Sequence, residues 1–307
     1  MTAIRMPAQR RLTAILLLLG AMAVLPVMDA IAKHLSHSLP LLQITWARFT
    51  FHLLWLLPAA LLRHRPHELI PARTGLQLLR GCCLTAATFL FFGGVSRMPI
   101  ADTLALSFVS PLVVTLLSPL LLDERVGARR LSAVAVGFAG ALVIVRPGLG
   151  VFQPAALFGL GTGAVYAFYV ITTRRLAGTA PALVTLAYTA LIGMLGTSLA
   201  VPFVWVPPTP AEWGFMVAMG AVAALGHLLI ILAYERGEAS MLSPFSYTEM
   251  IGAVTVGYFA FGDFPDRWTW VGIAILVASG IYISLREHRG ARRSAAAAQE
   301  PEEITPG

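Results

Sequence analysis

Residues 97–122 read RMPIADTLALSFVSPLVVTLLSPLLL. The apolar run from Ala101 to Leu122 is long enough to cross a hydrocarbon core of ~30 Å as a helix. Pro111 lies near its centre, where the missing N–H frees a carbonyl group and bends the helix. The stretch therefore predicts a membrane-spanning helix with a kink at mid-depth. Such a kink is either part of a binding site or an ordinary feature of a membrane helix.

The composition of the whole chain is that of a membrane protein. Of its 307 residues, 57% are hydrophobic and 12% are charged, with a mean hydropathy of +0.77, which excludes a soluble globular enzyme. Nine further apolar runs have about the length of a membrane span. They cover residues 12–32, 41–62, 76–95, 131–145, 155–173, 182–203, 211–233, 241–261 and 268–285. We therefore expect an all-α integral membrane protein with ten transmembrane helices.

The distribution of basic residues predicts the orientation of the chain. If the N-terminus is cytoplasmic, 16 of the 22 Lys and Arg residues fall on the cytoplasmic side and four on the other side. This excess predicts that both termini are cytoplasmic, in a multi-pass protein of the bacterial inner membrane. Arg10-Arg11 and the small residues Ala30 and Ala32 also fit a cleaved signal peptide, but the length of the run favours a membrane helix.

Three pairs of landmarks indicate an internal duplication. Ala101 and Ala239 open the fourth and ninth runs, Glu124 and Asp263 close them, and two arginines end the fifth and tenth runs, with offsets of 138 to 140 residues. Five spans per half invert the second copy relative to the first. We expect a cytoplasmic N-terminus (1–11), two inverted five-helix repeats (12–146 and 147–285) and a disordered cytoplasmic tail (286–307).

Several motifs resemble the EamA family of the drug/metabolite transporter superfamily. They are residues 97–111, Asp123-Glu124-Arg125, the Gly137 to Gly148 stretch, residues 243–249 and residues 261–265. The resemblance covers roughly residues 12–285. It implies transport by alternating access through a cavity lined by the first, third, fourth, sixth, eighth and ninth helices. Relatives move amino acids, riboflavin, S-adenosylmethionine and other metabolites. Asp263 stands where the family usually has a glutamate, and Glu249 where many relatives have a neutral residue.

Ionisable groups inside the spans are candidate site residues because burying a charge in the bilayer costs about 2.5 to 3.5 kcal/mol. Glu249 lies near mid-depth, and Arg48 is too deep to reach the surface easily. His227 is a candidate partner of Glu249 for proton coupling, and Asp29 and Lys33 have the spacing of an ion pair on one helix face. A satisfied histidine, a structural glutamate and an interfacial ion pair remain the alternative interpretations.

Aromatic and hydroxyl side chains at helical spacing complete the predicted site, although each aromatic pair also fits plain helix packing. The predicted substrate-binding residues are Arg48, Phe89, Phe92, Ser107, Ser110, Tyr166, Tyr169, Tyr247 and Glu249. Arg80, close to a helix end, is expected to reach the lipid headgroups. Gly159 and Gly163 form a GxxxG motif typical of helix packing.

The sequence contains no pattern of catalytic or metal-binding residues, and the adjacent Cys82 and Cys83 do not suggest a disulfide. We expect no enzyme activity, no cofactor and no nucleic-acid partner, and the oligomeric state is left open. The expected function is secondary transport of a small organic metabolite, first of all efflux of an amino acid or related solute. Uptake of a cofactor-like solute such as S-adenosylmethionine or riboflavin is the alternative within transport. A non-transporting scaffold subunit is the alternative outside it.

Overall fold

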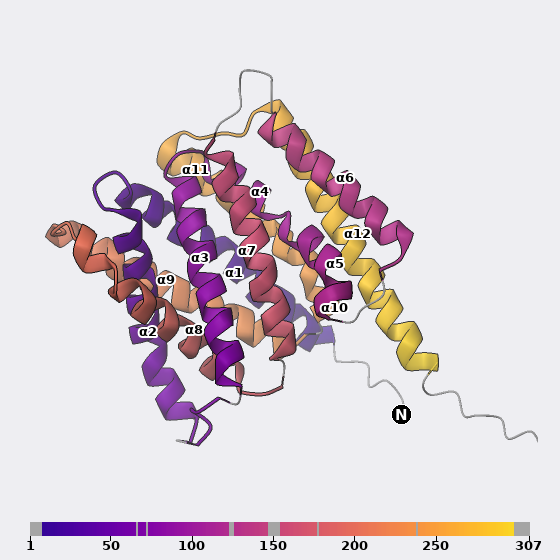
Figure 1. Cartoon of the computed structure of the whole chain (residues 1–307), viewed down its shortest axis with the longest axis horizontal. Coiled ribbons are helices and arrows are strands. Elements are labelled where there is room, and N and C mark those ends of the chain that lie inside the picture. Colours follow the sequence, from indigo (N-terminus) through magenta and orange to yellow (C-terminus); the bar gives the residue numbers. More distant parts are fainter. Residues whose placement is uncertain are drawn as a thin grey trace, which may run out of the picture.

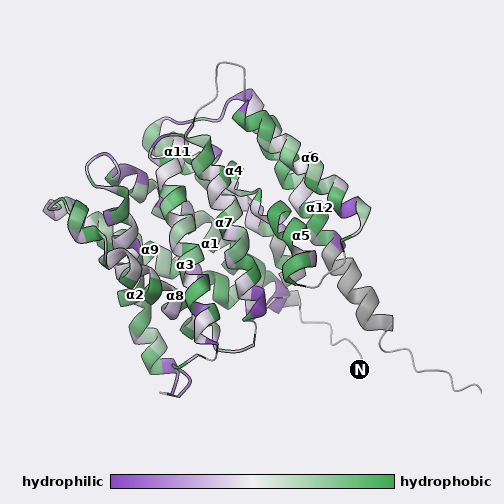
Figure 2. Ribbon diagram, viewed as in Figure 1, coloured by the Kyte–Doolittle hydropathy of each residue, from purple (hydrophilic) through white to green (hydrophobic). Residues whose placement is uncertain are grey.

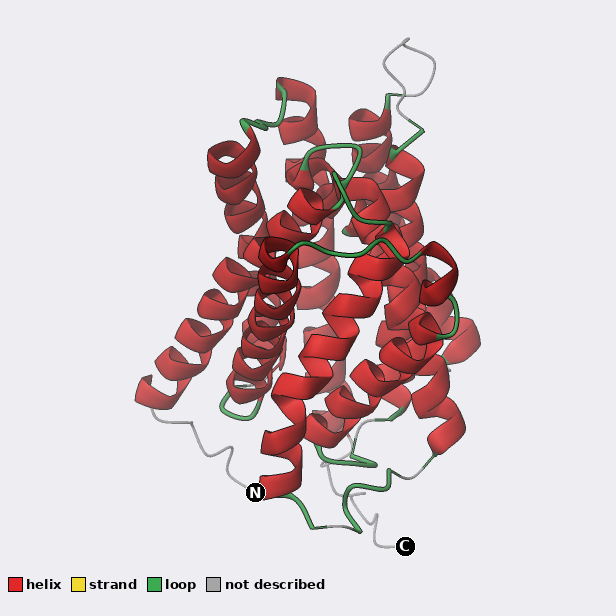
Figure 3. Ribbon diagram, turned by 90° about the vertical axis from the view of Figure 1, so that its left-hand side faces the viewer, coloured by secondary structure: helices red, strands yellow, loops and turns green. Residues whose placement is uncertain are grey.

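The computed structural model of the chain describes residues 8–65, 67–71, 73–122, 126–146, 154–176, 178–237 and 239–297. Within these ranges the regular elements are all helices (Figure 3). The α-helices are α1 (Ala8–Leu35), α2 (Leu41–Arg63), α3 (Thr74–Val95), α4 (Ile100–Ser107), α5 (Ser110–Leu121), α6 (Ala128–Val145), α7 (Ala156–Arg175), α8 (Ala182–Ser198), α9 (Pro210–Tyr234), α10 (Ala239–Leu242), α11 (Glu249–Phe261) and α12 (Arg267–Ala297). Two 3₁₀ helices, η1 (Val201–Val204) and η2 (Ser243–Thr248), complete the set.

Helix ends follow the local chemistry of the sequence. Pro40, Pro99 and Pro181 each precede the first turn of a helix in an extended conformation, where the missing N–H costs nothing. At the start of α9, Thr209 and Glu212 form a reciprocal capping box. Gly262 ends α11 with a φ of 71°, a left-handed conformation that favours glycine. The turns are therefore determined locally.

The helices have the length and composition of membrane spans. Among the described residues, seven helical stretches are long and apolar enough to cross a membrane, and two shorter apolar helices accompany them. Figure 2 shows that hydrophobic residues cover the lengths of the helices, while the strongly hydrophilic residues gather mainly at their ends and in loops. The expected all-α membrane fold is thus confirmed. The count of ten spans stays a prediction.

Two of the predicted spans are interrupted near their centres. The fourth is divided into α4 and α5, and the interruption lies directly before Pro111, which occupies the first turn of α5. The ninth begins as the short α10, continues as the 3₁₀ turn η2 and becomes α-helical again at Glu249. At the first interruption the N–H of Phe108 donates to the carbonyl oxygen of Leu104 and that of Val109 to the carbonyl oxygen of Leu106, so these backbone groups stay hydrogen-bonded.

Helix packing follows a regular pattern across the chain. Helix α1 packs against α9 and α11, and α3 packs against α7 and α8. Helix α2 packs against α8 and α9, and α7 also packs against α4 and α5. Figure 1 shows α6 and α12 lying side by side along most of their length. If each of the first five predicted spans is exchanged with its counterpart in the second five, the same set of helix pairs results. The contact between α1 and α9, for example, becomes the contact between α7 and α3.

Close helix approach depends on small residues at defined places. A Cβ atom on Gly163 would lie 2.8 Å from the carbonyl oxygen of Ser107, and one on Gly159 would lie 3.2 Å from that of Thr103. The GxxxG motif therefore brings α7 against the interrupted fourth span, which confirms its role in packing.

The C-terminal segment differs from our expectation. Helix α12 continues past Arg286 to Ala297, where the sequence suggested a disordered tail from residue 286. The alanine run that begins at Ala295 favours helix. Residues 1–7 and 298–307, the Asp123 to Arg125 motif and residues 147–148 lie outside the described ranges.

Candidate functional site

A cavity of about 420 Å³ lies between the two interrupted helices and their neighbours. The six predicted helices contribute to its wall, and α2 and α12 contribute as well. Its lining is mostly apolar, with a minority of polar and charged side chains. The lining residues used below are Asp29, Arg48, Leu84, Ala87, Thr88, Phe91, Phe92, Ser107, Phe108, Ser110, Pro111, Thr162, Tyr166, Val170, Arg174, His227, Tyr247 and Glu249.

Arg48 of α2 is the basic group most deeply set in the cavity wall. It is 3% exposed, and its guanidinium lies 4.2 Å from the centre of the Phe49 ring. Within the described part of the chain, its Nε and Nη1 atoms have no hydrogen-bond partner. Because a buried guanidinium without an acceptor is costly, this group is suited to an anionic ligand such as a carboxylate.

Two carboxylates also reach this cavity. Asp29 of α1 is 3% exposed, and Glu249 stands at the start of α11, directly after the η2 turn. Asp29 lies within electrostatic reach of both Glu249 and Arg48. The site therefore combines a cationic side and an anionic side in one enclosed space.

The helix interruptions supply hydroxyl and aromatic groups. Ser107, Ser110 and Tyr247 all line the cavity, as does Pro111. The Ser107 hydroxyl donates to the carbonyl oxygen of Leu104 at 2.7 Å, which satisfies the end of α4. The Tyr247 ring packs edge-on against Phe108, with 5.1 Å between ring centres. The two interruptions are thus in direct contact across the cavity.

Only one member of each predicted aromatic pair lines the cavity. Phe92 of α3 is buried in its wall, whereas Phe89 is 36% exposed and lies outside it. Tyr166 of α7 lines the cavity, and Tyr169 packs beside it at 5.1 Å between ring centres. The face of α3 that lines the cavity carries Leu84, Ala87, Thr88, Phe91 and Phe92, and Phe89 lies on another face of the helix.

Arg80 does not reach the headgroups, contrary to our expectation. It is 5% exposed and donates to Thr173 Oγ1 at 2.8 Å, to Thr189 Oγ1 and to the carbonyl oxygen of Thr185 at 3.2 Å. Its Nη2 atom donates to the Tyr169 hydroxyl at 2.7 Å. The neighbouring hydroxyls and carbonyl make burial cheaper than extension towards the surface, and Arg80 thereby holds the tyrosine pair in place.

Two histidines lie close together beside Arg48. His227 of α9 lines the cavity, and its Nδ1 atom is 2.9 Å from the carbonyl oxygen of Ala223. Its ring centre is 5.1 Å from that of His52, which is 1% exposed and has no hydrogen-bond partner among the described residues. His227 is thus placed to face the same space as Glu249.

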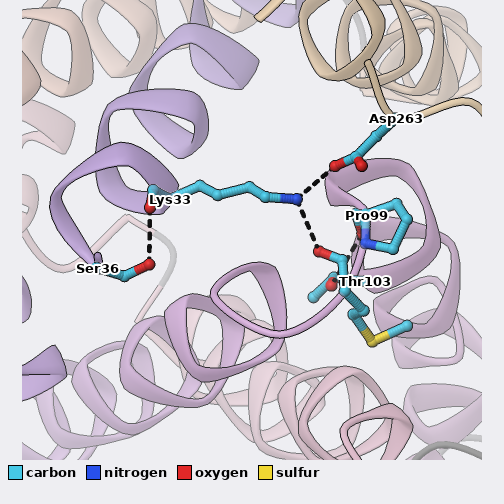
Figure 4. A network of polar contacts seen from close by, with 6 residues as sticks. Lys33, Ser36, Pro99, Thr103 and Asp263 are labelled. Atoms are coloured by element: carbon cyan, nitrogen blue, oxygen red, sulfur yellow. Dashed lines mark hydrogen bonds and ion pairs between the residues drawn. The ribbon is translucent and has the colours of Figure 1, made fainter. Parts of the chain in front are cut away.

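The expected ion pair between Asp29 and Lys33 is wrong. Lys33 forms an ion pair with Asp263, in the segment after α11, and donates to the carbonyl oxygen of Met98 at 3.2 Å (Figure 4). Asp29 turns into the cavity instead. A carboxylate distant in sequence thus replaces the one four positions away, because Asp29 faces the cavity while Lys33 reaches the segment after α11.

Sequence reasoning missed several lining residues. Thr162, Val170 and Arg174 line the cavity together with Tyr166, in a stripe with a spacing of four along α7. That spacing is visible in the sequence, and it indicates one helix face. Arg174, in the last turn of α7, also shows how far the cavity extends towards that end of the bundle.

Comparison with known proteins identifies the family. The sequence profile of the EamA-like transporter family matches residues 12–146 and again residues 153–285. The chain is 24% identical to the "S-adenosylmethionine uptake transporter" of Rickettsia bellii over 85% of its length and 89% of the relative's. It is 32% identical to the "Riboflavin transporter" of Vibrio cholerae over 64% of its length and 66% of the relative's. It is 27% identical to the "Pseudopaline exporter" of Pseudomonas aeruginosa over 84% of its length and 91% of the relative's.

The fold is also found among solved structures. A protein crystal structure superposes with a TM-score of 0.61 at 21% identity, covering 90% of this chain and 98% of the other. The double profile match spans most of the sequence, and the relatives above are membrane transporters by name. The chain therefore belongs to the EamA-like transporter family.

Proposed function

We propose that this protein is a secondary transporter that moves a small organic metabolite across the bacterial inner membrane, with export of an amino acid or related solute as its first function. The observation that carries the proposal is Arg48, a buried guanidinium beside a cavity of about 420 Å³, whose Nε and Nη1 atoms have no acceptor among the described residues. A carboxylate bound beside the guanidinium would place an acceptor and an opposite charge where the described residues provide no acceptor for Nε or Nη1. No enzyme activity is part of the proposal.

The proposed architecture is a pair of inverted five-helix repeats, ten spans in all, with both termini in the cytoplasm. Two observations support it. The family profile matches the chain twice, and the helix contacts map onto themselves when the two halves are exchanged. The interrupted fourth and ninth spans occupy equivalent places in the two halves. A site between two such helices is typical of inverted-repeat carriers.

Alternating access requires that one end of the cavity close while the other opens. At one end, the Lys33–Asp263 pair and a second pair between Arg146 and Asp266, at 2.5 Å, join the first half to the second. The cavity extends towards the opposite end, to Arg174. In the proposed orientation this structure is closed to the outside and its cavity extends towards the cytoplasm.

Glu249 and His227 are the proposed proton-coupling groups. Glu249 is within electrostatic reach of Asp29 from α1 and of Tyr166 from α7. Arg48 from α2 interacts electrostatically with both Asp29 and His227. A carboxylate held among such groups changes its interactions when it takes up a proton. Protonation of Glu249 would thus alter the balance of charge in the cavity during the transport cycle.

One observation favours a cofactor-like solute as the second candidate. Phe91, Phe92, Phe108 and Tyr166 place aromatic rings around the cavity, and rings of this kind suit a flat ligand. Two of the relatives above carry the names of riboflavin and S-adenosylmethionine transporters. In this alternative the direction would be uptake.

The test is the thermal stability of the detergent-purified protein with amino acids, nucleosides, riboflavin and S-adenosylmethionine, because a selective ligand stabilises the folded state. We expect one amino-acid class to raise the melting temperature, and Arg48→Gln to abolish the shift. Arg129→Gln, at an exposed position on α6, is the matched control. A shift with riboflavin alone would favour the second candidate. No shift with any compound would contradict both and favour a scaffold subunit.

A further inference from the structure

We propose that Asp29 is a specificity-determining residue, which with Glu249 holds a cationic amine while Arg48 holds an anionic group. The solute is then a zwitterion bound across the cavity. This inference rests on the proposed transport function and narrows its substrate class. The geometry behind it is that two carboxylates, from α1 and α11, and one guanidinium, from α2, line the same cavity.

The charges are placed to bind a ligand rather than to neutralise one another. Asp29 and Arg48 are each 3% exposed, and no ion pair joins them in the ranges that the structure describes. Arg48 keeps Nε and Nη1 without acceptors. Burying charges that are not paired is unfavourable, so a protein gains from a ligand that completes them.

Asp29 and Glu249 are like charges that lie within reach of each other. Two buried carboxylates repel, and a cation between them replaces repulsion with two attractions. An ammonium group has three donors, which is enough to serve both carboxylates. The anionic side of the cavity therefore selects for a positive centre.

The positions of the carboxylates give this selection a second effect. Asp29 belongs to the first repeat and Glu249 to the second, and α1 packs directly against α11. A cation held between them links the two halves at mid-depth. A neutral ring system would not connect the two carboxylates. A simple anion would bind Arg48 but would leave both carboxylates without a cation.

The experiment compares three ligands with one carbon skeleton. L-phenylalanine carries both charges, 2-phenylethylamine only the amine and 3-phenylpropionate only the carboxylate. The panel also contains leucine and methionine, each with its amine-only and carboxylate-only analogue. It is completed by the remaining natural amino acids, riboflavin and S-adenosylmethionine. Binding to purified protein is measured by thermal shift and by titration calorimetry for the wild type, Asp29→Asn, Arg48→Gln and Asp102→Asn.

We expect the zwitterion of at least one skeleton to bind tenfold or more tightly than either single-charge form. Asp29→Asn should lose that preference yet retain the carboxylate-only ligand, and Arg48→Gln should retain the amine. This crossed pattern also shows that each variant is folded. Asp102→Asn is the matched control, because the Oδ1 atom of Asp102 in α4 has no partner among the described residues and Asp102 does not line the cavity.

Four outcomes would overturn the inference. Equal binding of the zwitterion and the carboxylate-only ligand, or an unchanged preference in Asp29→Asn, would remove Asp29 from the site while leaving the transport function intact. Binding of riboflavin without any amino acid would do the same. If no compound in the panel binds, the inference and the proposed function fail together.

Discussion

Lys33, in the last turn of α1, pairs with Asp263, which follows the left-handed Gly262 at the end of α11. The same ammonium group donates to the carbonyl oxygen of Met98, in the connection between α3 and α4 (Figure 4). Three segments from both halves of the chain thus meet at the single lysine of the sequence. Its side chain is 12% exposed and that of Asp263 is 27% exposed, so solvent only partly screens the pair.

Reversing this pair is the first test of closure at that end. We expect Lys33→Asp and Asp263→Lys each to lower the free energy of unfolding by roughly 1–3 kcal/mol and to slow transport, because each leaves two like charges in contact. The double exchange should recover much of both losses. Melting temperature and flux into proteoliposomes measure the effect. Arg97→Gln, at the same end, is the control. A double variant no better than either single variant would contradict the role of the pair.

Arg80 is expected to stabilise the fold strongly. Removing it in Arg80→Ala leaves the Tyr169 hydroxyl and the threonine hydroxyls of α7 and α8 without their donor. We expect a loss of roughly 1–3 kcal/mol, because buried hydroxyl and carbonyl groups lose their hydrogen-bond donor. Arg80→Lys should recover only part of it, because an ammonium group cannot reproduce the fork of the guanidinium. Arg129→Ala, exposed on α6, should change the melting temperature little. Equal melting temperatures for Arg80→Ala and Arg129→Ala would show that the network does not stabilise the fold.

Gly220 marks the closest approach of α9 to α2. A Cβ atom there would lie 2.2 Å from the Cβ of Phe51 and 2.8 Å from the backbone nitrogen of His52. Gly220→Ala should therefore destabilise the protein by about 1–3 kcal/mol through overpacking. Gly214→Ala in the same helix meets no atom within 4 Å and should be neutral or slightly stabilising. Thermal unfolding of the two variants side by side is the measurement, and similar melting temperatures would refute the close packing.

Glu249→Gln tests the proton-coupling proposal. The substitution preserves the shape of the side chain but removes its ability to change charge. We expect flux to become nearly independent of pH, with His227→Gln reducing the dependence only in part. Glu235→Gln, on an exposed position after α9, should leave the pH profile of the wild type unchanged. A Glu249→Gln protein with the full pH dependence would remove this residue from the coupling mechanism.

The predicted orientation can be tested with reporters fused after residue 307. A fluorescent protein fused there should fluoresce, because it folds in the cytoplasm, and an exported phosphatase should be inactive. The physical reason is that 16 basic residues lie on the proposed cytoplasmic side and only four on the other side. A reporter placed between Gly262 and Arg267 should give the opposite result. An active phosphatase at the C-terminus would reverse the topology.

Local patterns in the sequence were sufficient for the helices and for part of the site. Apolar runs and prolines indicate where helices lie and end, and the depth of Arg48 and Glu249 can be counted along them. Partners across the bundle could not be obtained this way. Lys33 has a carboxylate one turn away, and only the assembled fold shows that Asp263 is nearer.

Direction around a helix axis was the other limit. Phe89 and Phe92 share an apolar face by spacing, and the fold alone decides which of them meets the cavity. Arg80 lies near a helix end, and nothing in its own segment reveals the hydroxyls that α7 and α8 bring to it. The oligomeric state also lies beyond such reasoning.

The exchange of packing partners between the halves has a consequence for biogenesis. Helices α1 and α2 have their most extensive contacts with α9, α3 with α7 and α6 with α12, and all three of these partners are synthesised later. The first five spans must therefore wait in the bilayer, incompletely packed, until the rest of the chain leaves the ribosome. A truncated nascent chain would expose its small-residue faces to lipid and to quality-control proteases. Separately expressed halves should accumulate only when both are made in the same cell.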